Sequence, residues 1–171
     1  MTQPTFKQPD NLSLAQPNTF KFALTTIPNV VYNLQRVDLP GINISGTTVP
    51  TGPWTHADFS VPGEKLTYDP LTMGVLMDED FIGWKEVHDW MRRCTVAPGA
   101  TPKTHPIKEL ADGTLLVNNN YFKSNIQFTF YNMYPTYLGT IPFDYSIGPD
   151  SPITYDITLN YSHYDIKLMN R

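Results

Sequence analysis

The sequence has few of the residues that build a disulfide scaffold or a strongly charged surface. Its single cysteine, Cys94, excludes an intrachain disulfide, so a hydrophobic core must hold the 171 residues together. Charged residues make up only 16% of the chain, whereas about 25% is usual in a soluble domain. Either uncharged polar residues cover the surface of a monomer, or other chains cover it. We favour the second interpretation.

A basic surface and a long apolar segment are also missing. The formal net charge is −4, which does not favour a protein that grips a phosphate backbone. If DNA is a partner, we expect it to pass along the protein without being held. No apolar run approaches the roughly 18 residues of a membrane helix, so we expect no membrane insertion. Residues 1–5 lack the pattern of a secretory signal, which predicts a protein that stays in a cytoplasm or in a particle assembled there.

Recognisable catalytic motifs are absent as well. We find no phosphate-binding loop, dinucleotide fingerprint or nucleophile elbow, and no histidine or acidic signature surrounds Cys94. The histidines are scattered without the spacing of a metal site: His56, His88, His105 and His163. The chain is therefore predicted not to be an enzyme and to hold no cofactor or metal.

Most of the chain shows the alternation of apolar and polar residues that is typical of half-buried strands. Residues 1–19 are polar and contain several prolines, so we expect an N-terminal arm followed by a single domain over residues 20–171. In that domain, Phe20–Thr25 and Tyr32–Leu39 are predicted to form a hairpin around a turn at Pro28-Asn29.

The middle of the chain predicts a bent strand followed by a helix. The apolar positions of Leu66–Met77 change phase at Asp69-Pro70, which indicates a bend because proline cannot donate to a sheet. The acidic run Asp78–Asp80 suits a helix N-terminus and needs no bound cation. The expected apolar stripe of the helix packs on the sheet and consists of Phe81, Trp84, Val87, His88 and Met91.

The last third of the chain has the clearest strand pattern. Strands are predicted over Ile126–Tyr131, Ile141–Ile147 and Ile153–His163, each with one apolar face, and Ala111–Thr114 is predicted to be a hairpin turn. Open strands of this length would aggregate at their edges unless sister subunits paired with them. The pattern therefore predicts a mainly β protein with one α-helix, whose strands join those of neighbouring copies.

The segment from Gly46 to Gly63 is rich in Gly, Pro and Thr and is predicted to be a long loop. Long loops in a compact domain are uncommon unless they are functional. Its aromatic residues pack either on the domain's own surface or on another subunit. The candidates for an inter-subunit or inter-ring contact are Pro50, Pro53, Trp54 and Phe59.

Several stretches resemble the tail tube family of contractile-tailed bacteriophages, which is related in fold to the ring protein of the type VI secretion tube. The most specific stretch is LTYDPLTMGVLMDEDFIGWKEVHDWM, at Leu66–Met91. FTFYNMYPTYLGT at Phe128–Thr140, ITYDITLNYSHY at Ile153–Tyr164 and the Leu39-Pro40-Gly41 turn are also similar. Residues 1–17 lie outside the shared pattern, and the Asp69-Pro70-Leu71 step looks more like the baseplate tube-initiator members.

The resemblance implies a tail-tube-like β-barrel or sandwich subunit that forms stacked hexameric rings. Such rings would make a conduit for DNA ejection in a phage tail, assembled in the host cytoplasm, with tail sheath, baseplate hub and tape-measure proteins as partners. In that arrangement the polar strand faces would line the lumen, and the residues that we expect there are Asp144, Asp156, Thr158 and Asn160. The alternatives are a tube-initiator or terminator ring, a secretion-system tube ring, or a carbohydrate-binding β-sandwich.

Overall fold

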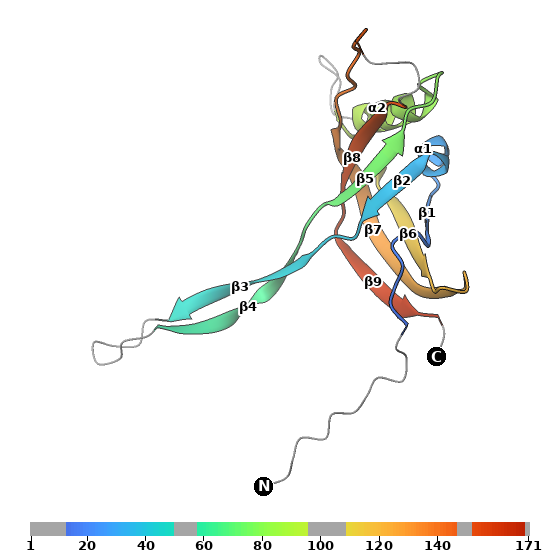
Figure 1. The fold of residues 1–171 in the computed structure, drawn as a ribbon. Coiled ribbons are helices and arrows are strands. Elements are labelled where there is room, and N and C mark those ends of the chain that lie inside the picture. The colour runs from blue at the N-terminus through green and yellow to red at the C-terminus, as the bar shows by residue number, and fades with distance from the viewer. Residues whose placement is uncertain (1–12, 50–57, 96–108, 147–151, 170–171) are drawn as a thin grey trace.

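The computed structural model of the protein describes residues 13–49, 58–95, 109–146 and 152–169. In chain order its elements are β1 (Phe20–Leu24), α1 (Pro28–Tyr32), β2 (Leu34–Asp38), β3 (Ile42–Val49), β4 (Phe59–Tyr68), β5 (Leu71–Leu76), α2 (Ile82–Cys94), β6 (Ala111–Asn118), β7 (Ser124–Leu138), β8 (Thr154–Asn160) and β9 (His163–Leu168). Figure 1 shows two parts, a body and a hairpin of β3 and β4 that projects from it.

The body is built around β7, which belongs to two parts of one sheet. The strand order is β1-β6-β7-β8-β5-β2, and β9 also pairs with β7. Residues 126–131 of β7 pair with β9, whereas its end at Tyr134–Leu138 pairs with β8. Asn132 lies between these halves with a left-handed φ of 57°. A long strand can thus join two sheet halves because it bends where its pairing changes.

The core lies on the inner face of this sheet, under α2. Strand β5 alternates strictly between buried Leu71, Met73 and Val75 and partly exposed residues, and β8 buries Tyr155, Ile157 and Leu159 in the same way. From α2, Val87 and Trp90 enter the core with no exposed surface. The predicted fold class, mainly β with one main helix, is confirmed, and the sheet does not close into a barrel within one chain.

Helix α2 begins at Ile82, later than the acidic run predicts, so Glu79 and Asp80 lie before the helix and not in its first turn. The Asp78 carboxylate accepts hydrogen bonds from the backbone N–H of Ile82 at 2.7 Å and of Gly83 at 3.2 Å, so it caps the first turn. The expected stripe is displaced, however. Gly83, Val87 and Trp90 are buried, whereas Trp84 and His88 stack on each other at the edge of that face, with ring centroids 5.3 Å apart.

Four local predictions are wrong. Strands β1 and β2 form no hairpin, because β1 pairs with β6 and β2 pairs with β5. The expected turn at Pro28 is the start of the short helix α1, in which proline occupies the first turn. Ala111–Thr114 begins strand β6 instead of forming a turn. The predicted strand over Ile153–His163 is two strands, β8 and β9, separated at Tyr161-Ser162.

In the segment predicted to be a loop, residues 46–49 and 59–63 belong to strands, and residues 50–57 lie outside the described residues. Strands β3 and β4 pair with each other along most of their length and with no strand of the body. Strand β4 then runs into β5 past Asp69-Pro70, so the predicted bend marks the point where the hairpin leaves the body. Among the residues of both strands, none is buried.

Candidate functional site

The described residues contain no arrangement suited to metal binding and no activated nucleophile. No group of three or more His, Cys, Asp or Glu side chains comes together within the four described ranges. Burial is the main cause that raises the pKa of Cys94, with the Glu109 carboxylate adding to it and Arg93 opposing it, so the thiolate is disfavoured. No helix in the described part of the chain is long and apolar enough to cross a bilayer. The surfaces that the fold leaves open are therefore the candidates for function.

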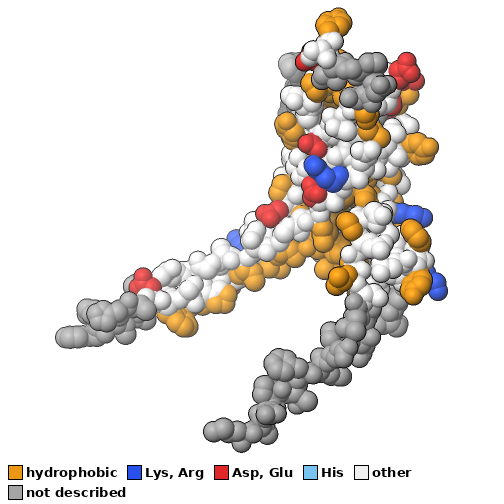
Figure 2. Space-filling model, in the orientation of Figure 1, with side chains coloured by type: hydrophobic (Ala, Val, Ile, Leu, Met, Phe, Trp, Pro, Cys, Tyr) orange, Lys and Arg blue, Asp and Glu red, His pale blue; other side chains and the backbone are white. Residues whose placement is uncertain are grey.

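One face of the β3–β4 hairpin is apolar and exposed. The cross-strand pairs Ile44↔Leu66 and Val49↔Phe59 place apolar side chains opposite one another, and all four are exposed by 45–64%. Figure 2 shows hydrophobic side chains along one side of the hairpin, from the body to its outer part. Exposed apolar patches of this kind mark interaction surfaces.

The two strands of the hairpin change phase together. On β3 the apolar positions pass from Ile42 and Ile44 to Val49, and on β4 they pass from Phe59 and Val61 to Leu66 and Tyr68. The pairing register shifts between Ile44 and Gly46, which is where both strands change parity. A bulge that adds residues turns the following side chains over. The irregularity therefore keeps the apolar residues of both strands on one face.

Gly63 makes this irregularity possible. A Cβ at residue 63 would lie 2.3 Å from the Ser45 carbonyl oxygen and 3.0 Å from its hydroxyl oxygen. Real Cβ atoms do not approach a backbone oxygen so closely, so only glycine allows the two backbones this contact. The run of Gly, Pro and Thr that predicted a loop thus contains a glycine that a bulged hairpin needs.

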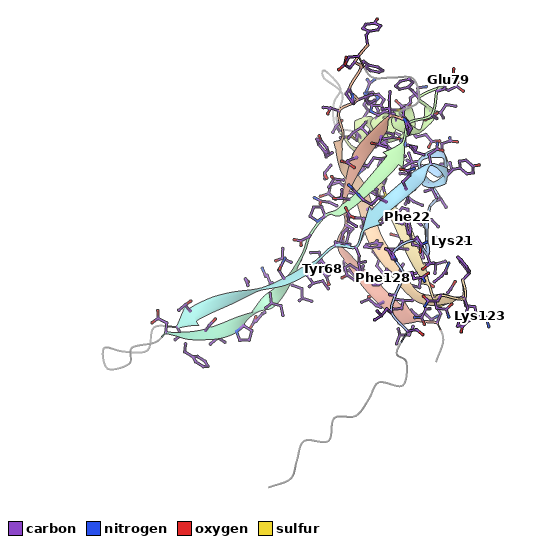
Figure 3. The ribbon with its side chains drawn as sticks, in the orientation of Figure 1. Lys21, Phe22, Tyr68, Glu79, Lys123 and Phe128 are labelled. Carbon is purple, nitrogen blue, oxygen red and sulfur yellow. The ribbon has the colours of Figure 1, made fainter. Side chains whose placement is uncertain are left out.

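An aromatic cluster holds the base of the hairpin against the body. The ring of Tyr68, at the end of β4, lies 5.9 Å from that of Tyr161 and 5.4 Å from that of Tyr164, and both of these rings also contact Phe130. Figure 3 shows Tyr68 where the hairpin meets the body. The Tyr161 hydroxyl donates a hydrogen bond of 2.8 Å to the Asp69 carbonyl, and burial is the main cause that raises its pKa.

Of the four predicted contact residues, only Phe59 lies within the described residues. Pro50, Pro53 and Trp54 lie outside the described residues. Phe59 is the first residue of β4, 64% exposed, at the outer part of the apolar face. The sequence interpretation missed the other members of this face. Val61 was assigned to the loop and Leu66 to the bent strand, and Ile42 and Ile44 were assigned to no element. The matching parity change in the two segments is the signal that could have found them.

Three of the four predicted lumen residues share one strand face. Asp156, Thr158 and Asn160 alternate with the buried residues of β8 and point away from the core. Asp144 does not belong to a strand, so the predicted strand over residues 141–147 is wrong for its described part. Its carboxylate instead accepts hydrogen bonds from the backbone N–H and hydroxyl of Ser146, both at 2.8 Å, and these bonds lower the pKa of Asp144.

The sheet around β8 has two free edges. Strand β2 pairs only with β5, and the end of β7 at Tyr134–Leu138 pairs only with β8 among the described strands. These edges lie at opposite ends of the order β2-β5-β8-β7. Pro135 lies in one of them, as is usual for proline, which cannot donate to a further strand.

A hollow of about 460 Å³ lies where β1 and β2 fail to meet. Its walls combine apolar side chains, among them Phe20, Val31 and Leu34, with Lys21 and Gln35. The hollow is open and brings together no pair of acid and base groups, so it has none of the parts of a catalytic site. It lies beside β1 and β2, the two ends of the strand order of the open sheet.

Known proteins resemble this chain in sequence and in structure. No protein-family model matches the chain. The tail tube terminator protein of Enterobacteria phage T4 is 24% identical to it over 160 residues, which are 89% of this chain and 89% of that protein. The cap of the anti-feeding prophage, its tube terminating cap, is similar in structure with a TM-score of 0.67 at 16% identity, and the match covers 98% of this chain and 99% of that one.

A chain of the baseplate of the anti-feeding prophage is similar as well, with a TM-score of 0.65 at 14% identity over 91% of this chain and 96% of that one. At such identities these structures establish the fold alone. The predicted resemblance to the tail tube family of contractile-tailed phages is therefore confirmed, and the chain shares the fold of these tube-related proteins.

Proposed function

We propose that this chain is a tube terminator, the subunit of a ring that closes one end of a phage tail tube. The observation that carries the proposal is the 24% identity to the phage T4 tail tube terminator over 89% of both chains. The fold does not separate a terminator from other tube rings, because a cap and a baseplate chain match almost equally well, with TM-scores of 0.67 and 0.65. The terminator, one of our alternatives from the sequence, thus has more support than the repeated tube ring that we expected first.

The free sheet edges support a ring. The edge of β2 and the end of β7 lie at opposite ends of the order β2-β5-β8-β7, so pairing of one with the other would join copies head to tail. Head-to-tail contacts of this kind produce closed rings or open helices. A closed ring would cover the edge of β2 and the end of β7 in each copy, which reduces the aggregation hazard that exposed strand edges create. We take the closed ring of like subunits as the working state.

The β3–β4 hairpin supplies the second contact. Its apolar face has no partner within the described chain, and its base is fixed by the tyrosine cluster, so it extends away from the body in a set direction. The face would bind a sister subunit or the adjoining ring, together with Pro50, Pro53, Trp54 and Phe59 of the original prediction. Residues Asp156, Thr158 and Asn160 would then line the lumen through which DNA passes.

The role is structural. The chain would act in the tail of a virion, between the last ring of the tube and the next component, without catalysis. Tail sheath, baseplate hub and tape-measure proteins remain predicted partners of the tube as a whole. For the terminator itself the tube ring is the essential partner, because a terminator has to bind a ring on one side and stop further addition on the other.

Electron microscopy of the purified chain tests the terminator directly. We expect single rings or short stacks at high protein concentration, and no long tubes. Immunogold labelling of the particle that carries the chain should mark one end of each tail tube. Label along the whole tube, or long tubes from the pure protein, would instead assign the chain to the repeated ring.

Cross-linking tests the head-to-tail ring. In a Cys94→Ser background, Gln35→Cys on β2 and Thr136→Cys on β7 should give a ladder of linked subunits with a short bis-maleimide. Each single cysteine variant is the control and should give no ladder, because in a head-to-tail contact its like residues do not meet. A ladder from a single variant would contradict this pairing.

A further inference from the structure

The polar face of the β2-β5-β8-β7 sheet carries a single cation. Strands β2, β5, β7 and β8 contain one basic residue, Arg36, and two acidic residues, Asp38 and Asp156. All three side chains are more than half exposed. The rest of this face is made of uncharged residues such as Thr72, Thr154 and Thr158. Figure 2 shows basic and acidic side chains side by side on the body above the hairpin.

Arg36 is held between the two carboxylates. Its Nε lies 3.4 Å from Asp38 Oδ2, two residues further along the same strand and therefore on the same face. Its Nη2 lies 3.2 Å from Asp156 Oδ1, on a strand that is separated from β2 by the whole of β5. The guanidinium thus engages an acid on each side, and the triad Asp38–Arg36–Asp156 carries a net charge of −1.

Gly74 allows the arginine to cross the intervening strand. The register aligns Arg36 with Gly74 and Gly74 with Asp156, so the three residues form one row across β2, β5 and β8. A Cβ at residue 74 would lie 3.4 Å from the Arg36 Cβ and 3.5 Å from Asp156 Oδ1. A side chain longer than alanine would therefore occupy the path of the guanidinium. The row is arranged so that Arg36 reaches the second acid.

Stability does not account for this arrangement. Exposed ion pairs contribute between about 0 and 1 kcal/mol, because water competes for both charges. The arrangement does change what else Arg36 can bind. A free guanidinium on a smooth polar surface is a ready phosphate ligand, since its planar fork matches two oxygens of one phosphate. In Arg36 the carboxylates engage Nε and Nη2, so part of the fork is already used, and an approaching phosphate meets net negative charge.

We propose that the Asp38–Arg36–Asp156 triad keeps the polar sheet face from capturing the phosphates of nucleic acid. The proposal rests on the proposed function, in which this face lines the channel and DNA is the polymer that moves through it. A single unpaired arginine in each subunit would form a ring of phosphate ligands around the lumen. The paired arginine lets the surface stay hydrated and polar without retaining the passing strand.

DNA binding by charge-neutralised variants tests the proposal. Fluorescence anisotropy with a labelled duplex of about 20 base pairs, at about 50 mM salt, is sensitive to weak phosphate contacts. We expect Asp38→Asn with Asp156→Asn to bind at least about threefold more tightly than the unchanged protein, and to lose this gain as salt rises. Adding Arg36→Gln to the double variant should return binding to the original level.

Glu79→Gln with Asp80→Asn is the matched control. Both residues are exposed beside α2, at the end of the body shown by Glu79 in Figure 3, and the net charge changes by the same amount. The control should bind DNA no better than the unchanged protein. Equal binding by the two double variants, or no gain in the Asp38 and Asp156 variant, would overturn the proposal. Rings seen by electron microscopy together with either result would leave the terminator function intact, whereas absence of rings would count against that function alone.

Discussion

The body buries many of its apolar side chains, whereas the β3–β4 hairpin exposes its own. In the body, Phe130, Met133, Ile157 and Trp90 have no exposed surface, and polar residues alternate with them. In the hairpin, Ile44, Leu66 and Phe59 are exposed by 53–64% although they share one face. A two-stranded hairpin without a packed face is marginally stable in water. The core of the body is therefore buried within one chain, whereas the described residues leave the apolar face of the hairpin uncovered.

The largest loss of stability is expected for a substitution in the core of the body. Trp90→Ala removes a side chain with no exposed surface and the 2.6 Å hydrogen bond from its Nε1 to the Glu109 carbonyl. We expect the free energy of unfolding to fall by about 3–5 kcal/mol, because a large cavity is left in a packed core. Urea unfolding followed by circular dichroism measures the loss. A loss below about 1 kcal/mol would mean that the body is not the rigid part.

A smaller effect is expected at the start of α2. Asp78→Ala leaves the N–H groups of Ile82 and Gly83 without their cap, which costs about 0.5–2 kcal/mol. Asp78→Asn is the matched variant, because its single amide oxygen still accepts one of the two bonds, and it should recover part of the loss in the same urea experiment. Equal losses for both variants would show that charge and not capping matters at this end of the helix.

Tyr155 offers a test by pH. Burial is the main cause that raises its pKa to about 12, and Asp78 and Glu86 add to it, so the folded state favours the neutral phenol. An unfolded tyrosine ionises near pH 10, and stability that is present below pH 10 is lost as the pH rises towards about 12. Tyr155→Phe should reduce this alkaline loss.

At neutral pH the same substitution should be neutral or slightly stabilising. The Tyr155 hydroxyl is buried without a hydrogen-bond partner in the described part of the chain, so its removal forfeits no bond there. Urea midpoints at pH 8 and pH 11 check both statements. A clear loss of stability at pH 8 would show that the hydroxyl is bonded.

The smallest effect on unfolding is expected in the hairpin, where the effect on assembly is largest. Ile44→Asn with Leu66→Asn should change the free energy of unfolding by less than about 0.5 kcal/mol, because both side chains already face solvent. The same variant should form no rings in negative-stain electron microscopy. Ile82→Asn, at an exposed apolar position of α2, is the control and should assemble normally.

The sequence predicts the body better than the hairpin, for a physical reason. Alternation in residues 126–131 and 154–160 marks half-buried strands because one chain supplies both the strand and its core. Helix α2 is predictable from Asp78 and the basic last turn, although the expected stripe includes the partly exposed Trp84 and His88 and omits the buried Trp90. Propensity signals of this kind are local, so they identify elements well.

Long-range pairing was harder to predict. Nothing in Phe20–Leu24 indicates that its partner is β6 and not the nearer β2, because register depends on residues about a hundred positions away. The hairpin was hidden by Gly46, Pro62 and Gly63, which usually indicate loops but here serve a bulge. The Asp38–Arg36–Asp156 triad was invisible for the same reason, since it needs the order of β2, β5 and β8.

Hydrogen–deuterium exchange of the hairpin amides tests whether another copy covers the apolar face of the hairpin. In the unassembled chain, amides of residues 42–49 and 59–68 should exchange rapidly, because this hairpin has no buried residue to protect it. In assembled rings or caps the same amides should exchange far more slowly, while those of β8 change little. Equally fast exchange of the hairpin in both states would contradict the claim that another copy covers its apolar face.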